Sequence, residues 1–215
     1  DAQLLDILAG KLPVDTQLNA LEAALTSGSA SAKEKVAAFV ESRDKQIESS
    51  PKVAYADCLE GGDIKAGREL FFTRSSLSCV RCHKVGETGG EVGPSLSQIG
   101  LQKDNGYLLE AIVAPDTAIA TGFETVVILT EDDENFSGIL KSEDDERVQI
   151  MDAQGALISI EKDSIVARKK GLSSMPAGLM KYMNRRDLRD LVAYLKSLDG
   201  TPEATANIGD VGGHK

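Results

Sequence analysis

The chain has 215 residues, a net charge of −10 and 41% hydrophobic residues, which is enough apolar material for one medium-sized or two small cores. No basic patch is present, so nucleic acid is not an expected partner, and no apolar run approaches the roughly 20 residues that span a bilayer. The acidity either steers the chain towards a basic face of another protein or simply keeps it soluble.

Residues 1–60 predict an N-terminal helical segment followed by a linker. Apolar residues recur there at helical spacing, and Ser31 and Glu34 have the spacing of a capping box. Short helices of this kind form either a small bundle or the last units of an α-helical repeat array. Pro51 and the pair Gly61-Gly62 mark the linker.

Residues 61–119 predict helices on either side of an irregular loop. Asp63 has the side chain of a helix N-cap, and 104–114 carries a second helical pattern. The stretch 84–102 between them is rich in glycine, as is typical of a loop that lies over a bound group.

From 120 to 169 the hydrophobic period changes to two, which predicts an inserted β-rich subdomain. The candidate strands are 123–130, 135–141, 146–151, 156–160 and 164–168. The connections between them are rich in Asp, Glu, Asn and Gly, the residues that tight turns require. Five short strands at this spacing predict a small antiparallel barrel.

A helical pattern returns over 170–200. Asn184 can cap a helix whose apolar face carries Leu188, Leu191 and Leu195. The last stretch, 201–215, has little to bury, so a mobile tail is expected there.

The sequence Cys79-Val80-Arg81-Cys82-His83 has the C-x-x-C-H pattern by which c-type haem is attached. Two thiols three positions apart reach the two vinyl groups on one edge of a porphyrin, and the following histidine ligates the iron. The other ring nitrogen of His83 should bond a backbone carbonyl, which fixes the ring. The pattern predicts one covalent haem c, with iron on His83 and with the thioether edge near Val80 and Arg81 partly exposed.

Two other chemistries use a C-x-x-C pair. A zinc site needs two further ligands, and the remaining candidates, Cys58 and His214, are both remote in the sequence. A thioredoxin-like dithiol belongs at the end of a strand in a βαβ unit, and no such unit is apparent. Cys58 is either a free thiol, an intermolecular bridge or a small buried residue at a domain junction.

A methionine is the expected second axial ligand. Met175 is the preferred candidate, because Pro176 stiffens the loop before the last helix and biases Met175 to extended geometry. The other candidates are Met151 in a predicted strand, Met180, Met183 and His214 in the tail. The alternative for Met175 is ordinary packing, with water or nothing on the iron.

Seven apolar residues are candidates for the lining of the haem pocket. They are Leu96, Ile99, Leu108, Ile112, Pro176, Leu179 and Leu191. For each of them plain core packing is the alternative, and the two roles overlap because a haem is itself a large apolar body.

Over residues 62–198 the chain resembles the class I c-type cytochromes. The resemblance lies in Gly67-x-x-x-Phe71, Gly93-Pro94-Ser95-Leu96, Met175-Pro176 and Tyr194. It implies a mainly α fold, the class I cytochrome c helical fold, with N-terminal helices and with a small antiparallel β-barrel-like insertion between the haem motif and the axial methionine. In compact members of the family the methionine follows the motif more closely, and the insertion accounts for the difference.

The resemblance also implies roles for particular residues. Gly67 would let the last helix cross closely, with Tyr194 as the aromatic partner on that helix. The carbonyl of Pro94 would accept the hydrogen bond of His83. The cytochrome domain would then comprise 61–119 and 170–200, with 120–169 as the inserted subdomain.

The layout is also similar to the haem-binding C-terminal region of large planctomycete and verrucomicrobial proteins that combine a dehydrogenase-like β-propeller, helical repeats and a terminal cytochrome c. This similarity implies a periplasmic protein whose signal peptide is removed or lies upstream. Its partner would be a redox protein or a fused dehydrogenase domain that oxidises sugars or alcohols, and a dimer is compatible with the sequence.

The predicted function is electron transfer by one haem with His83 and Met175 on the iron, and not enzymatic catalysis by the chain itself. An open coordination site would instead predict a peroxidase-like enzyme or a small-molecule sensor, although a peroxidase usually needs a distal acid–base group. A third possibility is a structural haem that mainly stabilises folding.

Overall fold

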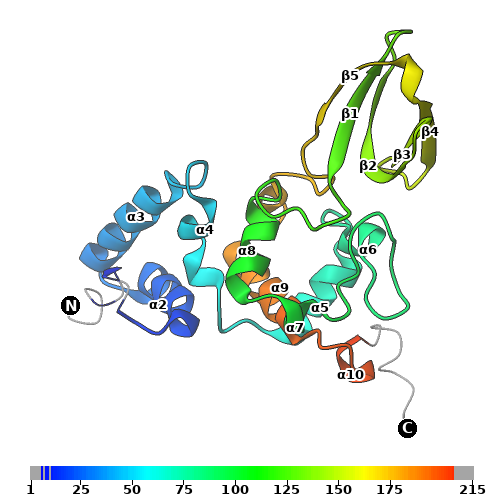
Figure 1. Cartoon of the computed structure of the whole chain (residues 1–215). Helices are drawn as coiled ribbons and strands as arrows, with labels where there is room; N and C mark the ends of the chain where they lie inside the picture. The colour runs from blue at the N-terminus through cyan, green and yellow to red at the C-terminus, as the bar shows by residue number, and fades with distance from the viewer. Residues whose placement is uncertain (1–5, 7, 10, 206–215) are drawn as a thin grey trace.

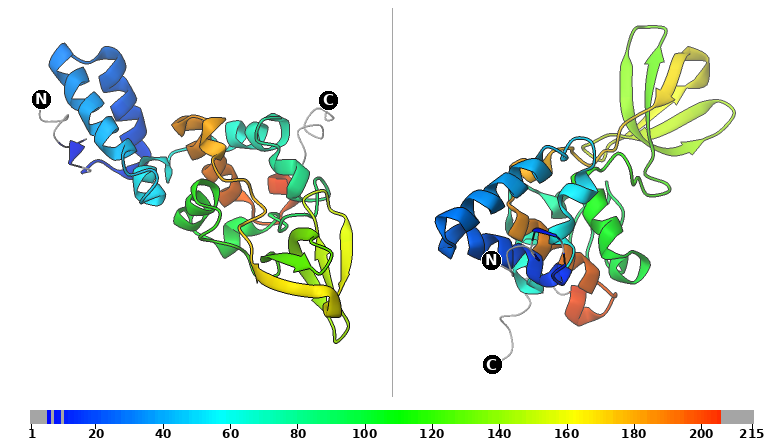
Figure 2. Two further views of the ribbon diagram at one scale, coloured as in Figure 1. Left: turned by 90° about the horizontal axis from the view of Figure 1, so that it is seen from above. Right: turned by 90° about the vertical axis from the view of Figure 1, so that its left-hand side faces the viewer.

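The computed structural model describes residues 6, 8, 9 and 11–205, and these form three parts arranged in a row (Figure 1). A pair of helices lies at one end, a twisted β-sheet lies at the other, and further helices pack between them. The two views of Figure 2 show the same order, with the sheet projecting from the helical part on the side away from the N-terminal helices.

The N-terminal part is an antiparallel pair of helices, α2 (Val14–Ser27) and α3 (Ala30–Asp44). Leu21 and Val36 form its small core. The predicted capping box at Ser31 is wrong: α3 begins at Ala30, and the side chain of Ser29 accepts a hydrogen bond from the backbone N–H of Ala32. Two short elements, α4 (Pro51–Ala54) and the 3₁₀-helix η1 (Ala56–Cys58), then lead to the central part.

The central part is a set of short helices around one apolar core. They are α5 (Ile64–Thr73), α6 (Cys79–Cys82), α7 (Ile99–Gln102), α8 (Asn105–Val113), the 3₁₀-helix η3 (Leu179–Lys181) and α9 (Arg185–Ser197). The predicted caps are confirmed, because Asp63 accepts from the N–H groups of Lys65 and Ala66, and Asn184 forms a reciprocal capping box with Asp187. These caps satisfy backbone donors that a helix leaves unpaired at its start.

The close crossing of α5 and α9 depends on Gly67. A Cβ atom at this position would lie 1.9 Å from the carbonyl oxygen of Asp190 and 2.8 Å from the Cβ of Tyr194. The rings of Phe71 and Tyr194 meet next to it, with centroids 5.7 Å apart. The predicted close approach, with Tyr194 as the aromatic partner, is confirmed.

Replacing Gly67 by alanine is expected to lower the free energy of unfolding by about 3 kcal/mol, because the new methyl group meets a backbone oxygen that cannot rotate away. Chemical denaturation of the purified protein measures this. Gly106 in α8 is the matched control, since a Cβ there has no neighbour closer than 3.3 Å. Alanine at Gly106 should be neutral or stabilising by about 0.5–1 kcal/mol. Equal changes in the free energy of unfolding at Gly67 and Gly106 would contradict the close contact of α5 with α9 at Gly67.

The third part is a five-stranded antiparallel sheet of order β4-β3-β2-β1-β5. Its strands are β1 (Thr125–Thr130), β2 (Asn135–Glu143), β3 (Arg147–Met151), β4 (Leu157–Glu161) and β5 (Ile165–Lys170), with the 3₁₀-helix η2 (Lys162–Ser164) before β5. Each predicted strand is present, with ends shifted by one or two residues. The hydrogen-bonded order leaves β4 and β5 at the two edges, so the predicted barrel is an open sheet.

One face of the sheet carries its own core. Val126, Ile128, Val148, Ile150 and Ile160 are buried together there. They occupy alternate positions along their strands, as the period of two in the sequence requires. The opposite face is therefore free to meet the helical part of the molecule.

The prediction of a mainly α protein with the class I cytochrome c fold is wrong. Helices make up 44% and strands 17% of the structure, and the strands form a five-stranded antiparallel sheet. The chain is thus a mixed α and β protein. The inserted segment was predicted to be β-rich, but its five strands form a sheet with a separate buried core and are therefore a main part of the fold.

The C-terminal segment begins with a short helix, α10 (Pro202–Thr205), where the sequence predicts a mobile tail. Residues 206–215, with His214, lie outside the described part, as do Asp1 to Leu5, Ile7 and Gly10. Among the described residues, none of the helices combines the length and the apolar character that crossing a membrane requires.

Candidate functional site

The C-x-x-C pair lies on a single helical turn, α6. Ser78, its N-cap, has left-handed backbone angles (φ 51°, ψ 32°), and His83 leaves the turn in an extended conformation. Cys79 and Cys82 are three positions apart, so both thiols project from the same side of the turn. Both are free and half-buried, and both line one cavity.

The His83 ring is fixed by the backbone of Gly93 and Pro94. Its Nδ1 lies 2.9 Å from the carbonyl oxygen of Pro94, so Nδ1 is the nitrogen that carries the proton and donates. Gly93 lies flat against the ring, since a Cβ there would be 2.6 Å from Cε1. Burial lowers the pKa of His83 below its usual value, while the bond to Pro94 opposes that shift. The ring is therefore neutral at pH 7, and Nε2 is left as a lone-pair donor.

Met175 comes to the same cavity from the far end of the chain. It lies in the loop that follows β5, is half-buried and lines the cavity together with His83. Met183 also lines the cavity, and Met180 packs against the central core. Met151 is buried in β3 and does not line the cavity. His214 lies outside the described residues.

The cavity has a volume of about 250 Å³ and contains every residue that the sequence analysis assigned to the cofactor. These are Cys79, Cys82, His83, Pro94, Leu96, Ile99, Leu108, Ile112, Met175, Pro176, Leu179 and Leu191. They come from α6, α7, α8, η3 and α9 and from the loops next to them, and α6 to α9 are labelled in the central part of Figure 1. Val80 and Arg81 are not among the lining residues, and Arg81 is exposed.

The inserted sheet contributes a wall of the cavity that no sequence pattern predicted. Ile139 of β2 and Phe123, just before β1, both line the cavity. Ile139 is almost fully buried, yet it lies outside the sheet's own core, because it points from the opposite face. In the sequence Ile139 looks like any buried strand residue. The one signal that distinguishes it is its place in the alternation, which puts its side chain on the face opposite to the sheet's own core. Tyr107 and Lys103 also line the cavity, and the Lys103 ammonium lies 4.2 Å from the Tyr107 ring centroid.

The burial of the Cys79 thiol is unfavourable for a reactive dithiol. Burial raises the pKa of the Cys79 thiol to about 11. Redox-active pairs and zinc ligands require the thiolate, and their sites lower the pKa of cysteine. No group of three or more His, Cys, Asp or Glu side chains with metal-binding geometry is found among the described residues.

The residues present fit a covalently held porphyrin. The cavity walls are mainly aliphatic and aromatic, two free cysteines lie on one turn, and a neutral imidazole is fixed beside them. Gly93 leaves room for the imidazole where any side chain would displace it. The available donors are one imidazole nitrogen and one thioether sulfur, the pair that haem iron accepts in electron-transfer proteins.

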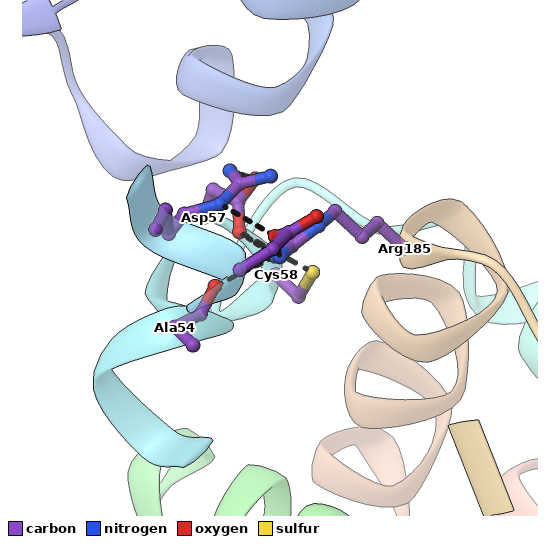
Figure 3. Close-up of polar contacts among 6 residues, drawn as sticks. Ala54, Asp57, Cys58 and Arg185 are labelled. Carbon is purple, nitrogen blue, oxygen red and sulfur yellow. Dashed lines mark hydrogen bonds and ion pairs between the residues drawn. The ribbon is translucent and has the colours of Figure 1, made fainter. Parts of the chain in front are cut away.

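A buried ionic cluster lies away from the cavity and joins the N-terminal helices to α9 (Figure 3). The carboxylate of Asp57 is 5% exposed and accepts from Arg43 at 2.7 Å and from Arg185 at 2.8 Å. Arg185 also donates to the Ala54 carbonyl at 2.8 Å. The cluster therefore connects α3, η1 and the start of α9.

Cys58 belongs to this junction and not to the cavity. Its side chain is fully buried, its Sγ lies 3.7 Å from Oδ1 of Asp57, and burial raises its pKa to about 12. A buried, protonated thiol is unsuited to an intermolecular bridge. Its position agrees with the third of the sequence interpretations, a small buried residue at a junction.

Comparison with known proteins adds no assignment. The chain matches no protein family, and no curated protein is significantly similar to it.

Proposed function

We propose that this chain transfers single electrons through one c-type haem, attached to Cys79 and Cys82 and ligated by His83 and Met175. One observation carries the proposal: the attachment motif and Met175, far apart in the sequence, line the same apolar cavity. The resemblance to c-type cytochromes supports it through Pro94 and Tyr194, although the class I fold is not the fold of this chain.

The residues around the cavity fix the position of the His83 ring and keep water away from it. Nδ1 of His83 holds its proton against the Pro94 carbonyl, which keeps Nε2 unprotonated and orients the ring. The apolar wall that includes Leu108 and Ile112 excludes water, and both burial and thioether ligation favour the reduced state. The bound iron would supply the one-electron couple.

The lining also bears on the alternative of a peroxidase-like enzyme. Within the described residues, no carboxylate and no second histidine lines the cavity, and Lys103 is the single charged side chain there. Peroxide chemistry usually needs a distal acid–base group. Electron transfer is therefore the better supported function, and a sensor with an open site is the alternative that the experiment below must exclude.

The partner and the location are part of the same proposal. The net charge of −10 supports docking to a basic face of a redox partner, through an attraction that salt screens. The resemblance supports a periplasmic protein that receives electrons from a dehydrogenase, either as a separate protein or as a fused domain.

The test is an intact mass together with a pyridine haemochrome spectrum of protein matured in cells that attach c-type haem. The expected result is one haem per chain, bound through two thioethers. Carbon monoxide should bind weakly or not at all to the reduced protein, because both axial positions are filled. Colourless protein with free thiols, or with zinc, would refute the proposal, and rapid carbon monoxide binding would favour the sensor.

A further inference from the structure

The loop that carries Met175 has few anchors of its own. Leu172 is 75% exposed, and Ser174 and Pro176 are also exposed. Side-chain burial therefore does not fix the stretch between the end of β5 and Met175. The path of this stretch must depend on hydrogen bonds to other segments.

Those hydrogen bonds are made with Thr125, at the beginning of the inserted segment, and with Asp116, just before that segment. The hydroxyl of Thr125, the first residue of β1, donates to the carbonyl of Leu172. The backbone N–H of Gly171 donates to the Thr125 carbonyl at 2.8 Å. The backbone N–H of Ser173 donates to the carboxylate of Asp116 at 2.7 Å.

The last step to the methionine is local. The backbone N–H of Met175 donates to the side-chain oxygen of Ser173 at 3.2 Å, so the anchored residue holds its neighbour. Gly171 permits the approach, because a Cβ at this position would lie 2.5 Å from the Thr125 hydroxyl. Thr125 and Asp116 therefore form hydrogen bonds to three consecutive residues before Met175, which are Gly171, Leu172 and Ser173.

The burial of Thr125 shows that this contact is built into the interface between the sheet and the helices. Thr125, Ile139 and Met151 are opposite one another on β1, β2 and β3, on the face away from the sheet's own core. They are 4%, 1% and 9% exposed. A hydroxyl in such a place costs free energy unless it is hydrogen-bonded, and the carbonyl of Leu172 is its partner.

We propose that Thr125 is a positioning residue for Met175, and that the inserted sheet serves as a clamp that holds the axial-ligand loop over the cavity. This inference rests on the proposed function, because it assigns Met175 to the iron. The clamp acts on the backbone of Gly171–Met175, and the sulfur follows.

The test compares Thr125→Val with Thr125→Ser in the haem-loaded full chain. Valine has nearly the same shape and removes the donor, whereas serine keeps it. In Thr125→Val the weak sulfur–iron absorption band at the red end of the spectrum should decrease. The haem fraction open to carbon monoxide should rise about 5- to 30-fold, the range expected for the loss of about 1–2 kcal/mol from one hydrogen bond. Thr125→Ser should behave as the wild type.

Hydrogen exchange gives a second readout that does not depend on the ligand. The amides of Gly171, Ser173 and Met175 should exchange faster in Thr125→Val and at the wild-type rate in Thr125→Ser. If Thr125→Val fails to fold, the same measurements are made on Asp116→Ala and Asp116→Asn. Asp116 is exposed and accepts the hydrogen bond of the Ser173 N–H, which asparagine can still accept and alanine cannot.

The outcomes separate the clamp from the proposed function. In one outcome the wild type has the sulfur–iron band, and Thr125→Val changes neither this band nor the amide exchange rates. That result would overturn the clamp and leave the electron-transfer proposal intact. A wild type without that band, in which Thr125→Val still speeds exchange, would overturn Met175 as the ligand and support the clamp.

Discussion

A variant with serine at both Cys79 and Cys82 is expected to be purified without covalently bound haem. Serine is close in size to cysteine but forms no thioether, and both residues lie on the one turn that borders the cavity. Intact mass and haem staining of a denaturing gel measure the loss, which should be complete. Single replacements should leave one thioether and reduce the yield.

Cys58→Ala is the control for that experiment. Its thiol is as buried as any in the chain but belongs to the junction with the N-terminal helices. This variant should keep one haem per chain. The assignment fails if the double variant still carries covalent haem, or if Cys58→Ala loses it.

Asp57→Ala should lower the free energy of unfolding by about 1.5–3 kcal/mol, because it removes the buried carboxylate that two half-buried guanidinium groups share, while Asp44 still pairs with both. Arg43 and Arg185 are 12% and 17% exposed, so water can replace Asp57 only in part. Chemical denaturation, with the variant's haem content matched to the wild type, measures the change.

Glu41→Ala provides the matched control, since its ion pair with Lys45 at 2.9 Å is exposed on both sides. Pairs of that kind contribute little, so no measurable change is expected. If Asp57→Ala is as mild as Glu41→Ala, the cluster does not hold the N-terminal helices to α9.

Local patterns in the sequence selected residues that the fold brings together. The C-x-x-C-H motif, the Pro176 that follows Met175 and the apolar faces of α8 and α9 are short-range signals, and the fold brings all of these residues to one cavity. The strands were also predictable, because alternation with a period of two and acidic turns mark them directly.

Long-range contacts were not predictable from one sequence. Nothing in the pattern pairs Asp57 with Arg185, or Thr125 with Leu172, since each pair is made by tertiary packing. Ile139 has the same pattern as Ile150, although one lines the cavity and the other fills the sheet's core. The fold class was wrong because a resemblance over helices assigned too little weight to a segment with its own core.

The pairing of β1 with β5 has a consequence for the modularity of the chain. Val126 is opposite Lys170, so the sheet's entry and exit are neighbours, about 4.8 Å apart as adjacent strands are. The gap between these two positions is no wider than a hairpin turn. The entropy cost of closing the chain between the helical segments on either side changes little with the length of the insert. Chain closure alone therefore permits a tight turn in place of the module, but that replacement removes Ile139 from the cavity wall.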